Sequence, residues 1–93
     1  MRINIQNQAE VSTRYTEKIE NRLTKLERFY DKIAYADVHI TSEGNSVTTY
    51  KLALKIGVPG HDVVVKQKGD KMNKLISNVM ESAKRQVKNL YNE

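Results

Sequence analysis

The sequence predicts an α+β domain in the order βαβββα, with two helices packed on one face of a four-stranded sheet. Two stretches, Ser12–Lys32 and Lys71–Tyr91, repeat apolar residues at helical spacing. Four shorter segments alternate apolar and polar residues, as half-buried strands do. Because each helix has one apolar stripe and the sheet has one apolar face, these surfaces are buried only if the three pack together.

The chain is expected to open with a short strand and a capped helix. Arg2–Gln6 alternates, with its two isoleucines facing inward. Asn7–Val11 forms a connection, and Ser12 or Thr13 is placed to accept hydrogen bonds from the first free N–H groups of the helix. The apolar stripe of this helix consists of Tyr15, Ile19, Leu23, Leu26, Tyr30 and Ile33.

Three further strands are expected in the middle of the chain. The second runs from about Ala34 to Ser42, and the turn cluster Glu43–Ser46 joins it to a third from about Val47 to Val58. Pro59-Gly60 predicts the next turn, because proline presets one central backbone angle and glycine accepts a positive φ at the other. The fourth strand covers His61–Lys68. The inward residues are expected to be Ala36, Val38, Ile40, Leu52, Leu54, Ile56, Val58, Val63 and Val65.

The last element is a second amphipathic helix. Gly69 and Asp70 end the fourth strand, and Asp70 is expected to cap a helix from Lys71 to about Tyr91. Its apolar stripe consists of Met72, Leu75, Ile76, Val79, Met80, Ala83, Val87 and Leu90. The chain has no internal repeat, linker or low-complexity segment, so residues 1–93 are expected to form a single domain.

The first helix sorts its charged residues by sign. With about 100° per residue, its basic residues share one flank and the outer face, and the centre of its acidic residues lies roughly 120° away. A helix that needed only solubility would interleave the two signs to gain i,i+4 pairs. The basic residues are Arg14, Lys18, Arg22, Lys25, Arg28 and Lys32, and the acidic ones are Glu17, Glu20, Glu27 and Asp31.

The rest of the positive charge gathers near the second helix. The formal net charge is +5. Between residues 66 and 88 the sequence has two acidic residues, Asp70 and Glu81, and seven basic ones, which are Lys66, Lys68, Lys71, Lys74, Lys84, Arg85 and Lys88. If both helices lie on one face of the sheet, their basic flanks are expected to merge into one surface. Such a surface suits a phosphate backbone, so nucleic acid is the expected partner.

The residue types for catalysis or metal binding do not converge. Asp37 and His39 share one strand face, but no serine or cysteine nucleophile accompanies them, so a surface pair is expected. There is no cysteine, the acidic residues are dispersed, and the four glycines do not form a phosphate loop. We therefore expect a non-enzyme without a cofactor, a metal site, a small-molecule substrate or an obligate oligomer.

The location expected is cytoplasmic. The sequence contains neither an apolar run long enough to span a bilayer nor a signal-peptide pattern. Membrane binding by the helices is also not expected, because their apolar stripes are needed to close the core.

The aromatic residues do not predict base stacking. Tyr15, Phe29 and Tyr30 fit the apolar stripe of the first helix and its edge, so packing explains them. Tyr35 and Tyr50 lie on strands and are freer, but no pair of aromatic residues on adjacent strands resembles that of an RNA-recognition motif. Backbone contact is therefore expected to dominate nucleic-acid binding.

Four segments resemble the ribosome hibernation-promoting factor family, which is also described as the sigma factor modulation protein family. They are Ile3–Ile5, Arg22–Arg28 with an aromatic residue after it, Ala36–Ile40 and Lys84–Val87. The most specific is Arg22–Arg28, which reads RLTKLER and fits the family signature R-L-x-K-L-E-(K/R). Its value comes from its place in the βαβββα order.

The resemblance implies a fold like the double-stranded-RNA-binding domain and a role in translation. A family member would bind the small ribosomal subunit between head and body and contact ribosomal RNA through basic residues of both helices. It would overlap the messenger RNA path and the transfer RNA sites, and so inhibit translation in stationary phase or starvation. The matching basic residues here are Arg22, Lys25, Arg28 and Arg85, and Lys84 and Lys88 are their neighbours.

Two departures and two alternatives accompany this interpretation. The second helix opens with Lys71-Met72-Asn73, where the family often has Asp-Met-Tyr. The chain resembles the short form, without the C-terminal dimerisation domain of long members or the acidic tail of protein Y.

One alternative to a ribosome-binding function is a general double-stranded-RNA-binding module that acts away from the ribosome. The other is a structural adaptor whose helical face binds an acidic protein.

Overall fold

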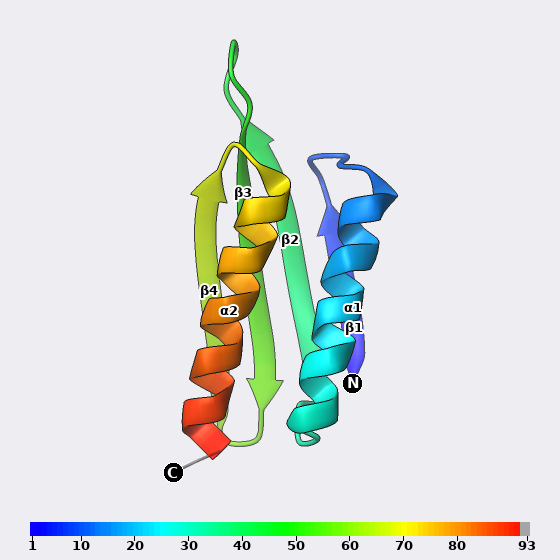
Figure 1. Cartoon of the computed structure of the whole chain (residues 1–93), viewed down its shortest axis with the longest axis vertical. Coiled ribbons are helices and arrows are strands. Elements are labelled where there is room, and N and C mark those ends of the chain that lie inside the picture. Colours follow the sequence, from blue (N-terminus) through cyan, green and yellow to red (C-terminus); the bar gives the residue numbers. More distant parts are fainter. Residues whose placement is uncertain (92–93) are drawn as a thin grey trace.

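The computed structural model describes residues 1–91 and confirms the order βαβββα. The elements are β1 (Arg2–Asn7), α1 (Thr13–Phe29), β2 (Tyr35–Glu43), β3 (Thr49–Val58), β4 (His61–Gly69) and α2 (Met72–Tyr91). The strands form one sheet in the order β1-β2-β3-β4, in which β1 is parallel to β2 and the other two pairs are antiparallel. Both helices lie side by side over one face of this sheet, as predicted (Figure 1).

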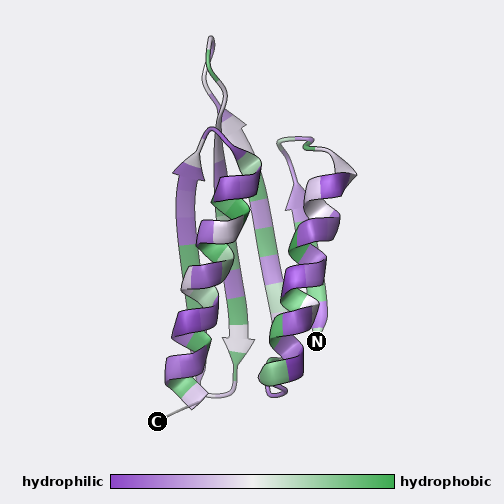
Figure 2. Ribbon diagram, viewed as in Figure 1, coloured by the Kyte–Doolittle hydropathy of each residue, from purple (hydrophilic) through white to green (hydrophobic). Residues whose placement is uncertain are grey.

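The core lies between the helices and the sheet. The inward residues expected on β2, β3 and β4 are buried, except Val58, which is half-buried near the end of its strand. The two isoleucines of β1 are also half-buried, because β1 is an edge strand. Apolar stretches recur between hydrophilic ones along both helices (Figure 2), and the buried residues of the helices belong to the predicted apolar stripes. No polar or charged side chain within residues 1–91 is buried. Most residues of the two helical stripes are buried in the core, and Tyr15, Tyr30 and Leu90 pack against it while partly buried.

The first helix is shorter than the predicted range Ser12–Lys32. Ser12 is its N-cap, and its hydroxyl accepts a hydrogen bond from the backbone N–H of Arg14 at 3.3 Å. At the other end Tyr30 has a non-helical φ of −134°, so the helix stops at Phe29. The assignment of Lys32 and Ile33 to this helix is therefore wrong. Both belong to the segment that leads into β2, where Ile33 is still buried.

The two strand hairpins differ in how closely they match the sequence pattern. The strand β3 begins at Thr49 rather than at Val47, and residues 44–48 form the hairpin tip that projects beyond the sheet in Figure 1. Gly44 there has a φ of +114°, which glycine adopts readily. The turn at Pro59-Gly60 is confirmed, with a φ of +81° at Gly60.

The start of α2 is not capped in the expected way. Its first helical hydrogen bond runs from the N–H of Leu75 to the carbonyl of Lys71 at 2.9 Å. Among the side-chain hydrogen bonds of residues 1–91, none runs from a backbone N–H of this turn to the carboxylate of Asp70. Neither helix in the described part of the chain is long and apolar enough to cross a membrane.

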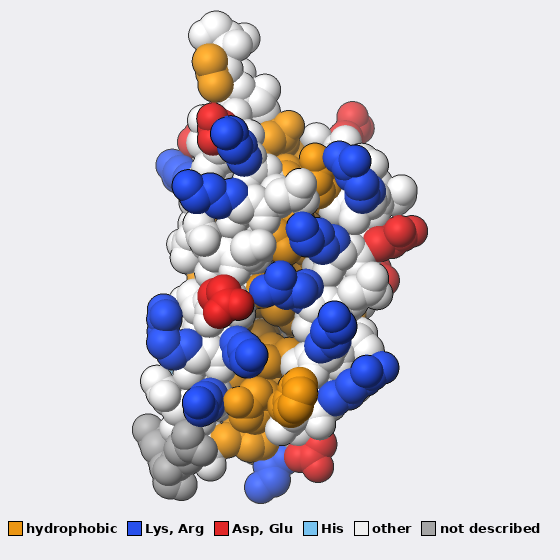
Figure 3. Space-filling view, viewed as in Figure 1, with side chains coloured by type: hydrophobic (Ala, Val, Ile, Leu, Met, Phe, Trp, Pro, Cys, Tyr) orange, Lys and Arg blue, Asp and Glu red, His pale blue; other side chains and the backbone are white. Residues whose placement is uncertain are grey.

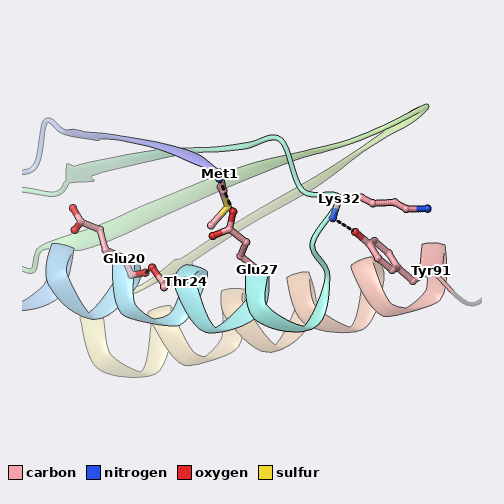
Figure 4. Close-up of polar contacts among 6 residues, drawn as sticks. All are labelled: Met1, Glu20, Thr24, Glu27, Lys32 and Tyr91. Atoms are coloured by element: carbon pink, nitrogen blue, oxygen red, sulfur yellow. Dashed lines mark hydrogen bonds and ion pairs between the residues drawn. The ribbon is translucent and has the colours of Figure 1, made fainter.

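Polar contacts join the ends of the helices to the rest of the fold (Figure 4). The terminal ammonium of Met1 pairs with the carboxylate of Glu27 at 2.5 Å, which ties β1 to α1. The backbone N–H of Lys32 donates to the hydroxyl of Tyr91 at 2.6 Å. The rings of Tyr30 and Tyr91 meet edge-on, with their centroids 4.8 Å apart. The last turns of α1 and α2 are therefore held next to each other.

Candidate nucleic-acid interface

The basic flank of α1 faces α2. Two side-chain contacts show this, because each crosses from one helix to the other. The ammonium of Lys18 donates to the side-chain carbonyl of Asn73 at 3.1 Å. The guanidinium of Arg22 lies 3.6 Å from the carboxylate of Glu81. The sorting of charges on α1 therefore places its cations beside the second helix, as the sequence predicted.

A hollow of about 400 Å³ lies between the two helices. Leu26 and Met80, which are both buried, contribute apolar surface to it. The residues that line it are Arg22, Lys25, Leu26, Phe29, Met80, Glu81 and Lys84. Figure 3 shows the same arrangement over the whole face, where an apolar strip runs between Lys and Arg side chains of both helices. The hollow thus combines an apolar surface with three cations.

The structure divides the six predicted RNA-binding residues into two groups. Arg22, Lys25 and Lys84 line the hollow. Arg28, Arg85 and Lys88 do not line it and are exposed on the outer surfaces of the helices. At about 100° per residue, Lys88 lies roughly 40° around the axis from Lys84, and Arg85 roughly 100° from it. The second group therefore extends the positive surface over the outside of both helices.

Glu81 is the one acidic residue among those that line the hollow. Its side chain is 71% exposed, and that of its partner Arg22 is 33% exposed. An exposed pair at 3.6 Å is a weak interaction, because water screens it and both side chains lose freedom in forming it. Arg22 is therefore available to a phosphate that approaches the hollow.

The prediction for Phe29 is wrong, because this side chain does not pack at the edge of the core. It is 75% exposed and lies in the hollow beside Lys25. Phe29 lies about 60° around the helix axis from the buried Leu26, so it points away from the core. It is also the last residue of α1. The signal that could have revealed this position is its spacing of seven residues from Arg22, which places both on one face.

The basic residues between positions 66 and 88 do not all lie on the same face of the molecule. Lys66 and Lys68 alternate with Val63 and Val65, which are buried, so they project from the open face of the sheet. Both lysines were predicted to belong to the fourth strand, where alternation sends neighbouring side chains to opposite faces. Their charge is therefore not part of the surface that the two helices form.

The remaining candidates lie on the same open face. Asp37 and His39 line a shallow hollow of about 330 Å³ together with Lys55 and Lys66. No group of three or more potential metal ligands occurs within residues 1–91.

Comparisons with known proteins agree with this architecture. A family model described as Sigma 54 modulation protein / S30EA ribosomal protein matches residues 3–92. Among solved structures, a ribosomal subunit interface protein from Coxiella burnetii is similar, with a TM-score of 0.84 and 18% identity over 100% of both chains. The N-terminal domain of Thermus thermophilus Protein Y has a TM-score of 0.80 and 20% identity, over 97% of this chain and 99% of that one. At these identities the structural likeness shows the fold. No curated protein sequence gives a significant match.

Proposed function

The chain belongs to the Sigma 54 modulation protein / S30EA ribosomal protein family, and we propose from this that it is a ribosome hibernation factor. In this proposal it binds the small ribosomal subunit in the channel for messenger and transfer RNA and inhibits translation in stationary phase or starvation. The resemblance found in the sequence is confirmed at the level of the family, which consists of ribosome-associated modulation factors, a non-enzymatic class.

The observation that supports binding to RNA is that the basic flanks of α1 and α2 lie next to each other. Arg22 and Lys25 from α1 and Lys84 from α2 line one hollow, and three further cations extend it. Cations carried on helices bind phosphates irrespective of base sequence, and arginine can bind a phosphate through two parallel hydrogen bonds. Recognition of RNA shape, rather than of base edges, follows from such a surface.

The proposed mechanism is competitive occupancy. A chain seated in the channel would occupy phosphates and space that messenger RNA and transfer RNA also need. The inhibition would involve no covalent step, and the proposal requires neither a cofactor nor a second copy of the chain. It assigns the protein to the cytoplasm, where ribosomes are found, and the binding unit to one domain over residues 1–93.

Two matched pairs of lysines test this proposal. Lys25 and Lys84 line the hollow, whereas Lys51 and Lys66 are exposed on β3 and β4, and none of the four forms an ion pair within residues 1–91. The double variant Lys25→Glu/Lys84→Glu should lose co-sedimentation with ribosomes. The control Lys51→Glu/Lys66→Glu has the same change in net charge and should retain it. Equal pelleting of both variants would place the contact elsewhere.

Sucrose-gradient fractionation separates this proposal from the module that acts off the ribosome. A hibernation factor should run with ribosomal fractions of a stationary-phase lysate. A general double-stranded-RNA-binding module or an adaptor for an acidic protein should stay in the light fractions. Recovery of the chain in the light fractions alone would therefore count against ribosome binding.

A further inference from the structure

Phe29 is an exposed aromatic ring in a positively charged hollow. Three large hydrophobic side chains within residues 1–91 are exposed, namely Phe29 at 75%, Val47 at 67% and Val64 at 50%. Val47 lies in the β2–β3 hairpin tip and Val64 on the open face of the sheet. Among these three, Phe29 is the one aromatic ring, and it lines the hollow between the helices together with Arg22, Lys25 and Lys84. Its ring contributes little to the core, which leaves it free to contact a partner outside the chain.

The surroundings of the ring define the chemistry of that partner. Arg22, Lys25 and Phe29 are spaced i, i+3 and i+7, so they share one face of α1. The helical rise of about 1.5 Å per residue puts Phe29 roughly 6 Å along the axis from Lys25. Met80 and Lys84 provide apolar surface and a cation from the opposite helix. A ligand for this place has a flat apolar part and a negative part a few ångströms away.

We propose that the hollow binds an unpaired nucleotide of RNA, with its base against the ring of Phe29 and the apolar side chains below. The adjoining phosphates contact Arg22, Lys25 and Lys84, and Arg22 exchanges the exposed carboxylate of Glu81 for a phosphate. The inference rests on the proposed function and names the part of the RNA that this surface recognises. A paired base keeps its faces inside the duplex, whereas an unpaired base offers a face for stacking.

The chain contains no tryptophan, which makes a direct test possible. Phe29→Trp places a single fluorescent ring in the hollow, and Val47→Trp places one on an exposed site in the hairpin tip. Titration with a short unpaired RNA should quench the emission of the first variant, and a duplex of the same sequence should quench it much less. The second variant should respond to neither. Binding of the unpaired RNA without quenching at position 29 would overturn the proposal, as would failure of the wild type to bind this RNA.

Affinity gives an independent measurement. Stacking on an aromatic ring typically contributes enough that Phe29→Ala should weaken binding of the unpaired RNA by about 5- to 150-fold, whereas Phe29→Trp should keep it. Because Phe29 is exposed, its removal should leave the thermal melting temperature nearly unchanged. Val47→Ala is the control and should bind like the wild type.

The same variants separate the failure of this inference from that of the proposed function. If the wild type fails to pellet with ribosomes while Phe29→Ala still weakens RNA binding, ribosome binding fails and the nucleotide site stands. If the wild type and Phe29→Ala pellet equally and bind the unpaired RNA equally, the nucleotide site alone is overturned. A loss of ribosome binding with unchanged affinity for RNA assigns the hollow to a protein segment and also overturns it.

Discussion

Arg22 of α1 forms an ion pair with Glu81 of α2, across the hollow between the helices. It lines the hollow, lies 3.6 Å from the carboxylate of Glu81 and keeps one third of its side chain exposed. Lys25 and Lys84, in contrast, have no ion-pair partner within residues 1–91. The proposed affinity for RNA therefore depends on how Arg22 is shared between Glu81 and a phosphate.

Glu81→Gln should strengthen the proposed binding. It removes the acidic group from the hollow and releases Arg22, and an exposed pair of this kind is typically worth up to about 1 kcal/mol. Affinity for unpaired RNA and for ribosomes should rise about 2- to 5-fold, measured by fluorescence anisotropy and by pelleting. Glu20→Gln is the control, because Glu20 is exposed on the flank of α1 that does not line the hollow. An equal gain from both variants would indicate a general charge effect.

At the scale of the elements, the hairpin of β2 and β3 contains one tight contact on its open face. Gly57 is paired with Tyr35 in the register of the two strands. A Cβ atom on Gly57 would overlap the ring of Tyr35, so this ring lies directly over the glycine. The glycine is buried even though it faces away from the core. One face of the Tyr35 ring therefore covers the sheet at Gly57.

Gly57→Ala should destabilise the fold. The added methyl group forces the Tyr35 ring to move, and overpacking of this kind costs about 1–3 kcal/mol. The thermal midpoint should fall by roughly 5–20 °C for a domain of this size. The double variant Gly57→Ala/Tyr35→Ala should show less than the sum of the two single losses, because removing the ring removes the clash. Strict additivity would contradict the contact.

The docking of the two helix ends gives a second prediction at this scale. Tyr91→Phe removes the hydroxyl that accepts a hydrogen bond from the N–H of Lys32 but keeps the ring beside Tyr30. The free energy of unfolding should fall by about 0.5–1.5 kcal/mol, measured by urea denaturation. Tyr50→Phe is the control, because the hydroxyl of Tyr50 takes part in no side-chain hydrogen bond of the described residues. Similar losses from both would show that the bond to Lys32 is not responsible.

At the scale of the whole molecule, the sheet separates two positively charged faces. The helical face carries the hollow, and the open face carries lysines of β3 and β4. On the open face Lys55 lies 3.7 Å from Asp62 and Lys68 lies 3.3 Å from Glu43, so part of the charge is neutralised. The net charge of +5 is thus spread over both faces, and only its arrangement distinguishes the proposed binding surface.

The salt dependence of ribosome binding measures how many cations take part. If each of the six predicted residues neutralises one phosphate, the logarithm of affinity should fall against the logarithm of salt with a slope of about −4 to −5. In the variant Lys25→Gln/Lys84→Gln this slope should become less negative by about 1.5, whereas in Lys51→Gln/Lys66→Gln it should stay unchanged. Equal changes in the two pairs would mean that both faces contact RNA.

The sequence by itself determined the elements and the sorting of charge. The alternation in β2 to β4 and the helical spacing in α1 and α2 identified most of the inward residues, because these periodicities are local properties of the backbone. The exceptions lie at the end of α1, where the spacing continued past Phe29 although the helix does not. The spacing of Arg22, Lys25 and Arg28 placed them on the exposed side of α1 for the same reason. Since only one face of the sheet is apolar, the position of both helices also followed.

Only the tertiary structure decided how the surface between the helices is built. The exposure of Phe29, the contact of Arg22 with Glu81 and the division of the six cations around one hollow depend on where α1 stops and how closely α2 approaches. These features result from packing between residues that are far apart in the chain. A periodic pattern predicts the direction in which a side chain leaves its own helix, but it does not predict which residues of the other helix lie opposite that side chain.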